Sequence, residues 1–466
     1  MNVKPRKITI DHDLIQKYTM RGPRYTSYPT APEWDESVGG THLRAHIEAT
    51  NAPDSKAPLS IYIHIPFCAE RCYYCGCNVI ISPQQDIGDR YVDHLIKEID
   101  LVAPSINPQR KVTQFHFGGG TPTFLKPEVF HRLLEYVFGQ FSFARDAELS
   151  LEADVRVTSK EHLDVLRKFG FNRISFGVQD FTKETQVAIN RVQSAMETYN
   201  FVTLCRTMGF KSVNIDLVYG LPHQTAETFR RTLKTMIEID PDRVALYNFA
   251  FLPSKMPFQR RIDENSLPDT NERFSILQAA IERFTENGYV YIGMDHFAKP
   301  EDELTIAQGE GTLQRNFMGF TTRAGTDLYA FGTSSISSLP ALYVQNVKKL
   351  NQYEKMVSAG EFPVERGIEL SRDDQIRRWV IMELMCNLRI DIPRFEATWK
   401  VDFHAYFQEE IDRLRPFIED GLLDPNIVRE IKVTDLGHII VRPIAMVFDA
   451  YLKKPNQSKA MFSKTL

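Results

Sequence analysis

The 466-residue sequence has no long apolar run, and its N-terminus, M-N-V-K-P-R-K-I-T-I, lacks the apolar core of a signal peptide. We therefore expect no membrane segment and a soluble, cytoplasmic protein. Thiols stay reduced in that compartment, so disulfides are not expected.

An excess of charge of one sign is also missing, because 56 lysine and arginine residues are balanced by 60 aspartate and glutamate residues, for a net charge of −4. This balance argues against a broad surface for nucleic acid or another polyanion, although it allows a local basic pocket. The length allows a large core and predicts two domains with an extension. We place an N-terminal arm at 1–55, an α/β core at 56–290 and a C-terminal domain at 291–466.

Cysteine is scarce except in one stretch, where four of the six cysteines, Cys68, Cys72, Cys75 and Cys77, fall close together. The first three have the spacing C-x3-C-x2-C. Three thiolates can hold three irons of a cubane [4Fe-4S] cluster, and the fourth iron is then left without a protein ligand. An open iron indicates a cluster that binds a reacting molecule, whereas an electron-carrying cluster usually has four cysteine ligands.

Three other interpretations of these cysteines are weaker. A structural zinc site usually pairs two C-x2-C knuckles, and no second knuckle or Cys/His pair occurs in the sequence. A disulfide cluster needs an oxidising compartment. Buried structural thiols fit the isolated Cys205 and Cys386, but they do not explain four cysteines packed so closely.

Strand-like and helix-like segments alternate through the core. The strand-like runs are 59–65, 112–117, 148–153, 173–178, 212–219 and 244–250, and helical periodicity is found at 89–102, 127–138, 160–169 and 225–237. Six strands that alternate with helices predict a parallel sheet. Periodicity alone does not choose between a curved partial barrel and a doubly wound fold.

Candidate site residues follow the predicted strands. The cysteine loop follows the first strand, and the run from Gly118 to Gly120 follows the second. Glu152, Gln179 and Ala250 are expected at the ends of the third, fourth and sixth strands. Asp216 lies on the fifth strand between apolar neighbours, where an unpaired carboxylate is costly, so it needs a partner such as a ribose hydroxyl or an ammonium group.

The alternation ends near residue 290. Helices are predicted at 375–388, 403–419 and 443–451, with a short helix-turn-strand pattern at 431–442. Such a combination could form a winged-helix-like DNA-binding module. No helix has a basic face, however, so a domain that covers substrate is the preferred interpretation.

Several motifs resemble those of the oxygen-independent coproporphyrinogen III oxidases of the radical S-adenosylmethionine (SAM) superfamily. The motifs are R-Y-T-S-Y-P (24–29), Y-I-H-I-P-F-C (62–68), C-G-C-N (75–78), F-G-G-G-T-P-T (117–123), G-V-Q-D-F (177–181), N-I-D-L-V-Y-G-L-P (214–222) and G-M-D-H-F-A (293–298). They are spread over nearly the whole chain. The resemblance implies an open (β/α)6 partial barrel with its chemistry at the carboxyl ends of the strands.

The resemblance also implies the cofactors and their residues. Cys68, Cys72 and Cys75 would hold the [4Fe-4S] cluster, and two SAM molecules would bind. The first SAM would contact Tyr62, Tyr74, Gly119, Glu152 and Ile336, and the second would contact Gly120, Thr121, Gln179, Arg191, Asp216 and Ala250. Tyr62, Cys77 and Glu152 are implied as catalytic residues.

The implied reaction is the anaerobic oxidative decarboxylation of coproporphyrinogen III to protoporphyrinogen IX in haem biosynthesis. A 5′-deoxyadenosyl radical made from SAM would remove a hydrogen from each reacting propionate. We expect a low-potential electron donor of the flavodoxin or ferredoxin type, a monomeric protein, and neither nucleic acid nor membrane as a partner. Arg24, Tyr25 and Tyr28 of the N-terminal arm are expected to help cover the substrate.

Two positions depart from the family pattern. Met318 stands where the family has a glutamine, and Phe251 stands where a histidine is usual. Both are expected on the substrate side of the cavity. The loss of two polar groups there leaves open a related radical SAM enzyme with another substrate, such as a methyltransferase or a haem-degrading enzyme.

Overall fold

A computed structural model describes residues 11–453, which form two compact units. The first unit contains the described residues up to Glu33, together with Asp269–Ala324 and the described residues from Leu370 onward. The second contains Trp34–Pro268 and Gly325–Glu369. These units divide the chain differently from the three predicted segments, because residues 325–369 belong with the α/β core.

The core of the second unit is a sheet with the strand order β16-β15-β14-β13-β1-β4-β5-β6-β7-β8. Its neighbouring parallel strands are β1 (Leu59–Ile65), β4 (Val112–Gly119), β5 (Phe143–Ala153), β6 (Arg173–Gln179), β7 (Ser212–Tyr219) and β8 (Arg243–Asn248). Strand β1 is almost wholly buried, as is usual for a parallel strand covered on both faces. The six predicted strands and their parallel pairing are confirmed.

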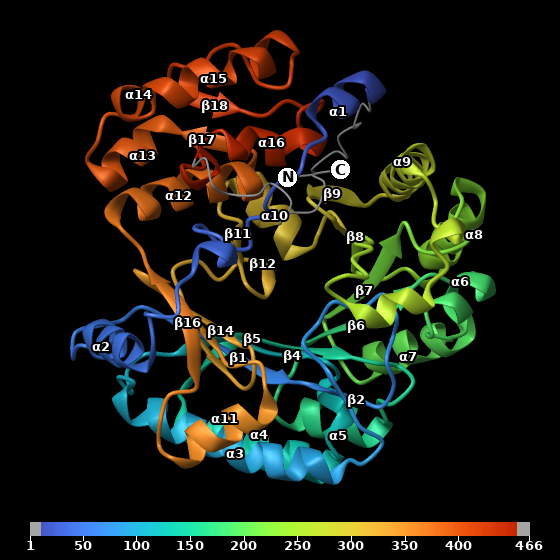
Figure 1. Ribbon diagram of the computed structural model, residues 1–466, viewed down its shortest axis with the longest axis vertical. Helices are drawn as coiled ribbons and strands as arrows, with labels where there is room; N and C mark the ends of the chain where they lie inside the picture. The colour runs from blue at the N-terminus through green and yellow to red at the C-terminus, as the bar shows by residue number, and fades with distance from the viewer. Residues whose placement is uncertain (1–10, 454–466) are drawn as a thin grey trace. The chain divides into compact units, whose positions relative to one another are not determined.

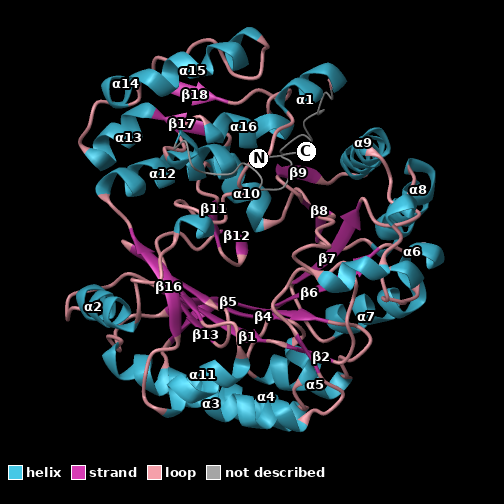
Figure 2. Ribbon diagram, in the orientation of Figure 1, coloured by secondary structure: helices cyan, strands magenta, loops and turns pink. Residues whose placement is uncertain are grey.

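Helices follow these strands in sequence and pack on the outer face of the sheet (Figures 1 and 2). They are α3 (Asp86–Val102), α4 (Pro127–Gln140), α5 (Lys160–Lys168), α6 (Lys183–Ala188), α7 (Ala195–Thr207) and α8 (Ala226–Ile239). Short 3-10 turns lie at Ala103–Ser105, Pro122–Phe124, Pro257–Arg261 and Glu264–Ser266. Local sequence explains the helix boundaries: Ser194 and Glu197, for example, form a capping box at the start of α7.

The sheet is extended by a segment that the sequence analysis assigned to the C-terminal domain. Strand β13 (Asp327–Phe331) pairs in parallel with β1, and β14 (Ile336–Leu339), β15 (Leu342–Asn346) and β16 (Val364–Glu369) continue from it in antiparallel pairs. Helices α2 (Gly40–Thr50) and α11 (Leu350–Ser358) belong to the same unit. The result is a mixed sheet around the six-stranded parallel core.

Three details of the predicted strand ends need correction. Strand β8 ends at Asn248, so Ala250 lies in the following loop and does not end a strand. Strand β4 runs on through Gly118 and Gly119 and does not stop before them. Strand β5 ends at Ala153, so Glu152 is its penultimate residue.

The first unit is mainly helical. Its helices are α1 (His12–Tyr18), α9 (Thr270–Glu286), α10 (Glu303–Glu310), α12 (Arg372–Asn387), α13 (Ile392–Trp399), α14 (Phe403–Tyr406), α15 (Gln408–Glu419) and α16 (Val441–Met446), with 3-10 turns at Ala31–Glu33, His438–Ile440 and Tyr451–Lys453. Its short strand pairs are β9 (Val290–Gly293) with β10 (His296–Ala298), β11 (Gln314–Asn316) with β12 (Gly319–Thr321), and β17 (Arg389–Asp391) with β18 (Glu430–Lys432).

Two predicted helices of this unit have different bounds in the structure. The helix expected at 403–419 is broken at Phe407 into α14 and α15. The helix expected at 443–451 is instead α16, which ends at Met446. Among residues 11–453, no helix is both long enough and apolar enough to span a membrane.

The R-Y-T-S-Y-P segment is anchored inside the first unit. Tyr25 and Tyr28 are 1% and 0% exposed. The Tyr25 hydroxyl donates to Asp449, 2.9 Å away, and the Tyr28 hydroxyl accepts from the backbone N–H of Ala450 at 3.1 Å. The expectation that these two tyrosines cover substrate is therefore wrong, because their side chains are buried in the unit's own core. Arg24 is paired with Asp295 at 2.8 Å.

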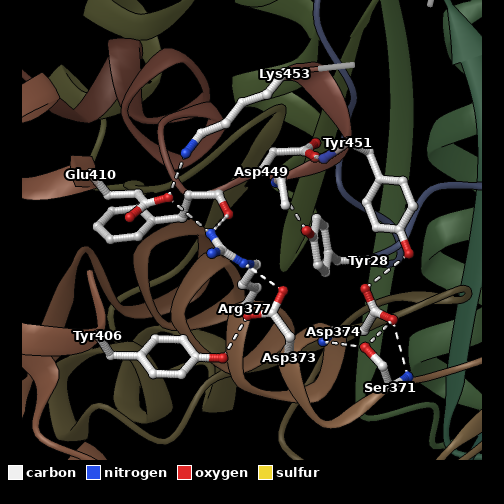
Figure 3. Close-up of polar contacts among 12 residues, drawn as sticks. Tyr28, Ser371, Asp373, Asp374, Arg377, Tyr406, Glu410, Asp449, Tyr451 and Lys453 are labelled. Carbon is white, nitrogen blue, oxygen red and sulfur yellow. Dashed lines mark hydrogen bonds and ion pairs between the residues drawn. The ribbon is translucent and has the colours of Figure 1, made fainter. Parts of the chain in front are cut away.

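A polar network beside these tyrosines fixes the last described turn (Figure 3). The Tyr451 hydroxyl donates to Asp374, the carboxylate that also caps the start of α12. Arg377 bonds Asp373 at 2.8 Å and Glu410 at 3.1 Å, and Lys453 reaches Glu410 at 2.9 Å. These bonds join the turn at 451–453 to α12 and α15.

Candidate active site

The second unit contains a cavity of about 800 Å³, lined by the cysteine loop and by residues at or just beyond the carboxyl ends of the parallel strands. This volume lies within the range of small-molecule sites. The predicted site residues that line it are Cys68, Cys72, Tyr74, Cys75, Cys77, Gly119, Gly120, Thr121, Glu152, Gln179, Arg191, Asp216 and Ala250. Tyr62 and Ile336 do not line it, and neither do Met318 and Phe251.

The cysteine loop is held at both ends by a small parallel pair of strands, β2 (Phe67–Cys68) and β3 (Ile80–Ile81). All the cysteines are free thiols. Among residues 11–453, no three His, Cys, Asp or Glu side chains converge closely enough to hold a single metal ion. A cubane cluster differs in this respect, since each thiolate binds a different iron, so the thiolates need not converge on one point.

The thiols of the loop differ in acidity. A hydrogen bond with the Cys77 thiol lowers the pKa of Cys75 to about 7, and the same bond raises the pKa of Cys77 above its ordinary value. Burial raises the pKa of Cys68 to about 11, although the Thr121 hydroxyl, 3.5 Å from its sulfur, opposes this rise. Of the two hydrogen-bonded thiols, Cys75 and Cys77, the Cys75 thiol is therefore the one that loses its proton more readily.

The glycine run is required by close approach within the protein. A Cβ on Gly119, whose φ is +126°, would lie 2.6 Å from the Ile65 carbonyl oxygen. A Cβ on Gly120 would lie 2.8 Å from the Phe67 carbonyl oxygen. The resemblance implied that Gly119 and Gly120 contact SAM. In the structure they let β4 approach the backbone that leads into the cysteine loop.

Two carboxylates, Glu152 and Asp216, line the cavity. The Glu152 side chain is half exposed and accepts a hydrogen bond from the Gly119 N–H at 3.2 Å. Burial, together with the charge of Glu152, raises the pKa of Asp216 to about 7, while a 2.7 Å hydrogen bond from Asn214 and the Arg191 charge oppose this rise. The sequence analysis expected a ribose hydroxyl or an ammonium group as the partner of Asp216, and the structure shows a partner within the protein, the Asn214 amide.

Unpaired polar atoms also line the cavity. The side-chain oxygens Oε1 of Gln179 and Oδ1 of Asn248 are buried and have no hydrogen-bond partner among the described residues. Buried polar atoms are seldom left unpaired, so two of them on one cavity wall indicate that a ligand with hydrogen-bond donors completes this site. Asn248 was not predicted. As the last residue of β8, it could have been found by the strand-end rule used for Gln179.

Tyr62 lies beneath the glycine run, beside the cavity. Its hydroxyl is 3.0 Å from Nδ1 of His64, and Nε2 of His64 is 3.1 Å from the carbonyl oxygen of Asn78. A Cβ on Gly118 would lie 2.9 Å from the Tyr62 hydroxyl oxygen. This chain of contacts joins β1 to the end of the cysteine loop. His64, two residues after Tyr62 on the same strand, was quoted in a motif but not predicted as a site residue.

Arg191 is the centre of an ion-pair network beside Cys72. Its guanidinium bonds the Gly177 carbonyl oxygen at 2.7 Å and Asp154 at 2.9 Å. Burial opposes ionisation of Asp154, yet Arg191 and Arg156 hold its pKa well below its usual range. Asp154 and Arg156 were not predicted either. They follow β5 directly, so the same strand-end rule could have found them.

Known proteins resemble this chain over nearly its whole length. Residues 62–236 match the radical SAM superfamily, and residues 370–429 match the HemN C-terminal domain. Oxygen-independent coproporphyrinogen III oxidase of Escherichia coli K12 is 46% identical over 96% of this chain and 97% of its own, and that of Synechocystis is 43% identical over 97% of each. The solved Escherichia coli coproporphyrinogen III oxidase (HemN), a radical SAM enzyme, superposes with a TM-score of 0.90 at 44% identity, over 96% of this chain and all of its own.

A partial barrel with a three-cysteine loop at the carboxyl ends of its strands defines a radical SAM enzyme, whose cofactors are a [4Fe-4S] cluster and SAM. Within that superfamily, the chain belongs to the oxygen-independent coproporphyrinogen III oxidases. The residues present fit these cofactors. Three free thiols line one cavity, and two residues of the same lining, Gln179 and Asn248, carry buried side-chain oxygens without a hydrogen-bond partner among residues 11–453.

Proposed function

We propose that the protein catalyses the anaerobic oxidative decarboxylation of coproporphyrinogen III to protoporphyrinogen IX, a step of haem biosynthesis. The observation that carries this proposal is the cavity in which the cysteine loop and the strand-end polar groups meet, in a chain 46% identical to enzymes of this name. When bound, the cluster and SAM supply the radical that starts the reaction. The protein supplies placement of the reactants and exclusion of water.

We assign Cys68, Cys72 and Cys75 as the cluster ligands and leave Cys77 outside the cluster. The spacing of the first three supports this assignment, as does their position in one cavity.

We propose two SAM sites. The first is assigned to Tyr62, Tyr74, Gly119, Glu152 and Ile336, and the second to Gly120, Thr121, Gln179, Arg191, Asp216 and Ala250. The cavity volume and the unpaired oxygens support binding of polar, nucleoside-sized ligands. Two assigned contacts with the first SAM, Tyr62 and Ile336, lie outside the cavity lining.

The catalytic assignment is Tyr62, Cys77 and Glu152. Glu152 presents a half-exposed carboxylate and is oriented by the Gly119 N–H, and Cys77 is an exposed thiol of the cavity lining. Tyr62 is joined to His64 by its hydroxyl, so a proton at that oxygen can be shared with the imidazole. Burial raises the pKa of Tyr62 well above its ordinary value, which keeps the phenol protonated at neutral pH.

Phe251 and Met318 bear on the choice of substrate. Phe251 packs on a buried apolar cluster that includes Ile189, Leu221 and Phe249, so an aromatic ring suits its surroundings. Met318 belongs to the other unit, where it lies in the turn between β11 and β12 and its N–H is bonded to Asn316. Coproporphyrinogen III is the proposed substrate despite both departures. The proposed donor is a low-potential carrier of the flavodoxin or ferredoxin type, and the proposed state is a monomer.

The test is anaerobic incubation of the reconstituted protein with SAM, dithionite and coproporphyrinogen III. We expect 5′-deoxyadenosine and vinyl-bearing porphyrinogens, both measured by liquid chromatography. Cys72→Ser is the matched control and should give neither product. Cleavage of SAM without any vinyl product would refute the substrate assignment and would support a related enzyme with another substrate.

A further inference from the structure

Four side chains near the cavity form a closed set of polar contacts. The Asp154 Oδ2 atom lies 2.9 Å from a terminal nitrogen of Arg191 and 2.7 Å from one of Arg156. Both guanidinium groups also reach the Cys72 sulfur, at 3.8 Å from Arg191 and 3.9 Å from Arg156. The Asp154 carboxylate therefore bonds both guanidinium groups, and both lie beside the Cys72 sulfur.

The two arginines are held in different ways. Arg191 is buried and is fixed independently, because its guanidinium donates twice to the Gly177 carbonyl oxygen. The Arg156 side chain is 25% exposed, and among residues 11–453 its guanidinium bonds only Asp154 and the Cys72 sulfur. The position of Arg156 therefore depends on Asp154.

The charges explain why a carboxylate is needed there. Two guanidinium groups that face one sulfur repel each other, and the carboxylate between them offsets this repulsion. The Asp154 side chain is only 9% exposed, so it would be costly to bury without its cationic partners. The two guanidinium groups therefore stabilise the buried carboxylate, and the carboxylate in turn holds Arg156 in place.

We propose that Arg156, held in place by Asp154, is a positioning residue that sets the electron affinity of the cluster through its contact with Cys72. This inference rests on the proposed function, since it takes Cys72 as a cluster ligand. Hydrogen bonds and positive charge at a ligand sulfur favour the more negative, reduced cluster and so raise its reduction potential. The step concerned is the entry of one electron from the low-potential donor, with no bond made or broken in the protein.

The test compares reduction potentials of reconstituted proteins in the absence of SAM and substrate, by titration followed by electron paramagnetic resonance. In Arg156→Gln we expect at least a tenfold fall in the ratio of reduced to oxidised cluster at a fixed potential, which is about 59 mV for one electron. Arg132→Gln removes an exposed arginine paired with Asp93 on the outer helices and serves as the matched control. It should leave the potential unchanged.

Asp154→Asn separates positioning from simple charge. If Asp154 acts by holding Arg156, its variant should also lower the potential, and the double variant should show no more than the larger single effect. A rise in potential in Asp154→Asn would mean that the carboxylate acts only as a negative charge, and would overturn the proposal. Additive effects in the double variant would overturn it as well.

Two further outcomes keep the inference distinct from the proposed function. If Arg156→Gln does not assemble a cluster, Arg156→Met, which also removes the charge and the N–H donors, is measured in its place, and an unchanged potential in that variant overturns the proposal. If Cys72→Ser retains its cluster, the ligand assignment itself is wrong. An unchanged potential in Arg156→Gln, with the cluster lost only in Cys72→Ser, would refute the positioning role and leave the proposed function standing.

Discussion

If Asp216 binds SAM as proposed, its carboxylate should make SAM binding dependent on pH. Its pKa is raised to about 7 by burial and by the charge of Glu152, against the effects of Asn214 and Arg191. A ribose hydroxyl or an ammonium group donates to the ionised form, so only that form is competent to bind. The ionised fraction is about 0.1 at pH 6 and about 0.9 at pH 8, so the apparent affinity should rise roughly tenfold between them.

The assay is calorimetric titration of the cluster-loaded protein with SAM, without reductant, at pH 6, 7 and 8. Asp216→Asn should bind more weakly at pH 8 and should lose most of the pH dependence. Asp164→Asn, which changes an exposed carboxylate paired with Lys160 on α5, is the matched control and should titrate like the wild type. Equal pH dependence in wild type and Asp216→Asn would refute the role assigned to Asp216.

Asp216→Asn should weaken SAM binding, but it should increase the stability of the folded protein when no SAM is bound. Because the folded-state pKa is above the ordinary value, the stabilising contribution of Asp216 is present at low pH and is lost as the pH rises through 7. Asp216→Asn should therefore raise the melting temperature at pH 8, with an upper bound of about 4 kcal/mol in free energy of unfolding. A variant that is more stable but binds less SAM identifies a ligand-binding carboxylate, whereas a destabilised variant would indicate a structural one.

Three other predictions follow from the structure. Cys77→Ser should keep its iron and sulfide after anaerobic reconstitution while Cys72→Ser should not, and equal loss in both would contradict the ligand assignment. Met318→Gln should increase vinyl product formation by up to roughly a hundredfold if the glutamine restores a hydrogen bond worth about 1–3 kcal/mol, and unchanged turnover would contradict a substrate-facing role. Tyr25→Phe should lower the free energy of unfolding by about 1–3 kcal/mol in chemical denaturation, because it leaves a buried carboxylate short of a partner, and the exposed Tyr199→Phe should change it little.

The parts of the molecule that depend on local pattern could be predicted from the sequence. The six parallel strands are short, buried runs separated by helices. The hydrophobic pattern of each strand or helix lies within one short segment of the sequence. The cysteine loop could be predicted because its ligand spacing lies within ten residues. Thirteen of the predicted site residues line the cavity. They could be predicted because parallel strands all end at one edge of the sheet, so residues at successive strand ends lie close together.

The parts that depend on distant contacts could not be predicted in the same way. Strand β13 pairs with β1 across more than 260 residues, and no local periodicity shows which strand it will join. Tyr25 and Tyr28 lie in a turn-rich segment that has the composition of a surface arm. Their burial follows from contacts with Asp449 and Ala450, near the opposite end of the chain. Pairing specificity of this kind is tertiary, so it leaves no mark on the segment itself.

The backbone around the cavity explains how the site can exist before a ligand binds. Gln179 and Asn190 have φ values of 71° and 54°, in the left-handed region that costs an L-residue about 1 kcal/mol or more. Asn190 is held there by a 2.9 Å hydrogen bond to the Arg71 carbonyl oxygen in the cysteine loop. Gly177 leaves open the space that the Gln179 amide occupies, since a Cβ there would clash with it. These contacts hold an unfavourable conformation that places Gln179 in the cavity lining, with its Oε1 atom buried. The neighbouring loops thus hold the polar lining of the site in place.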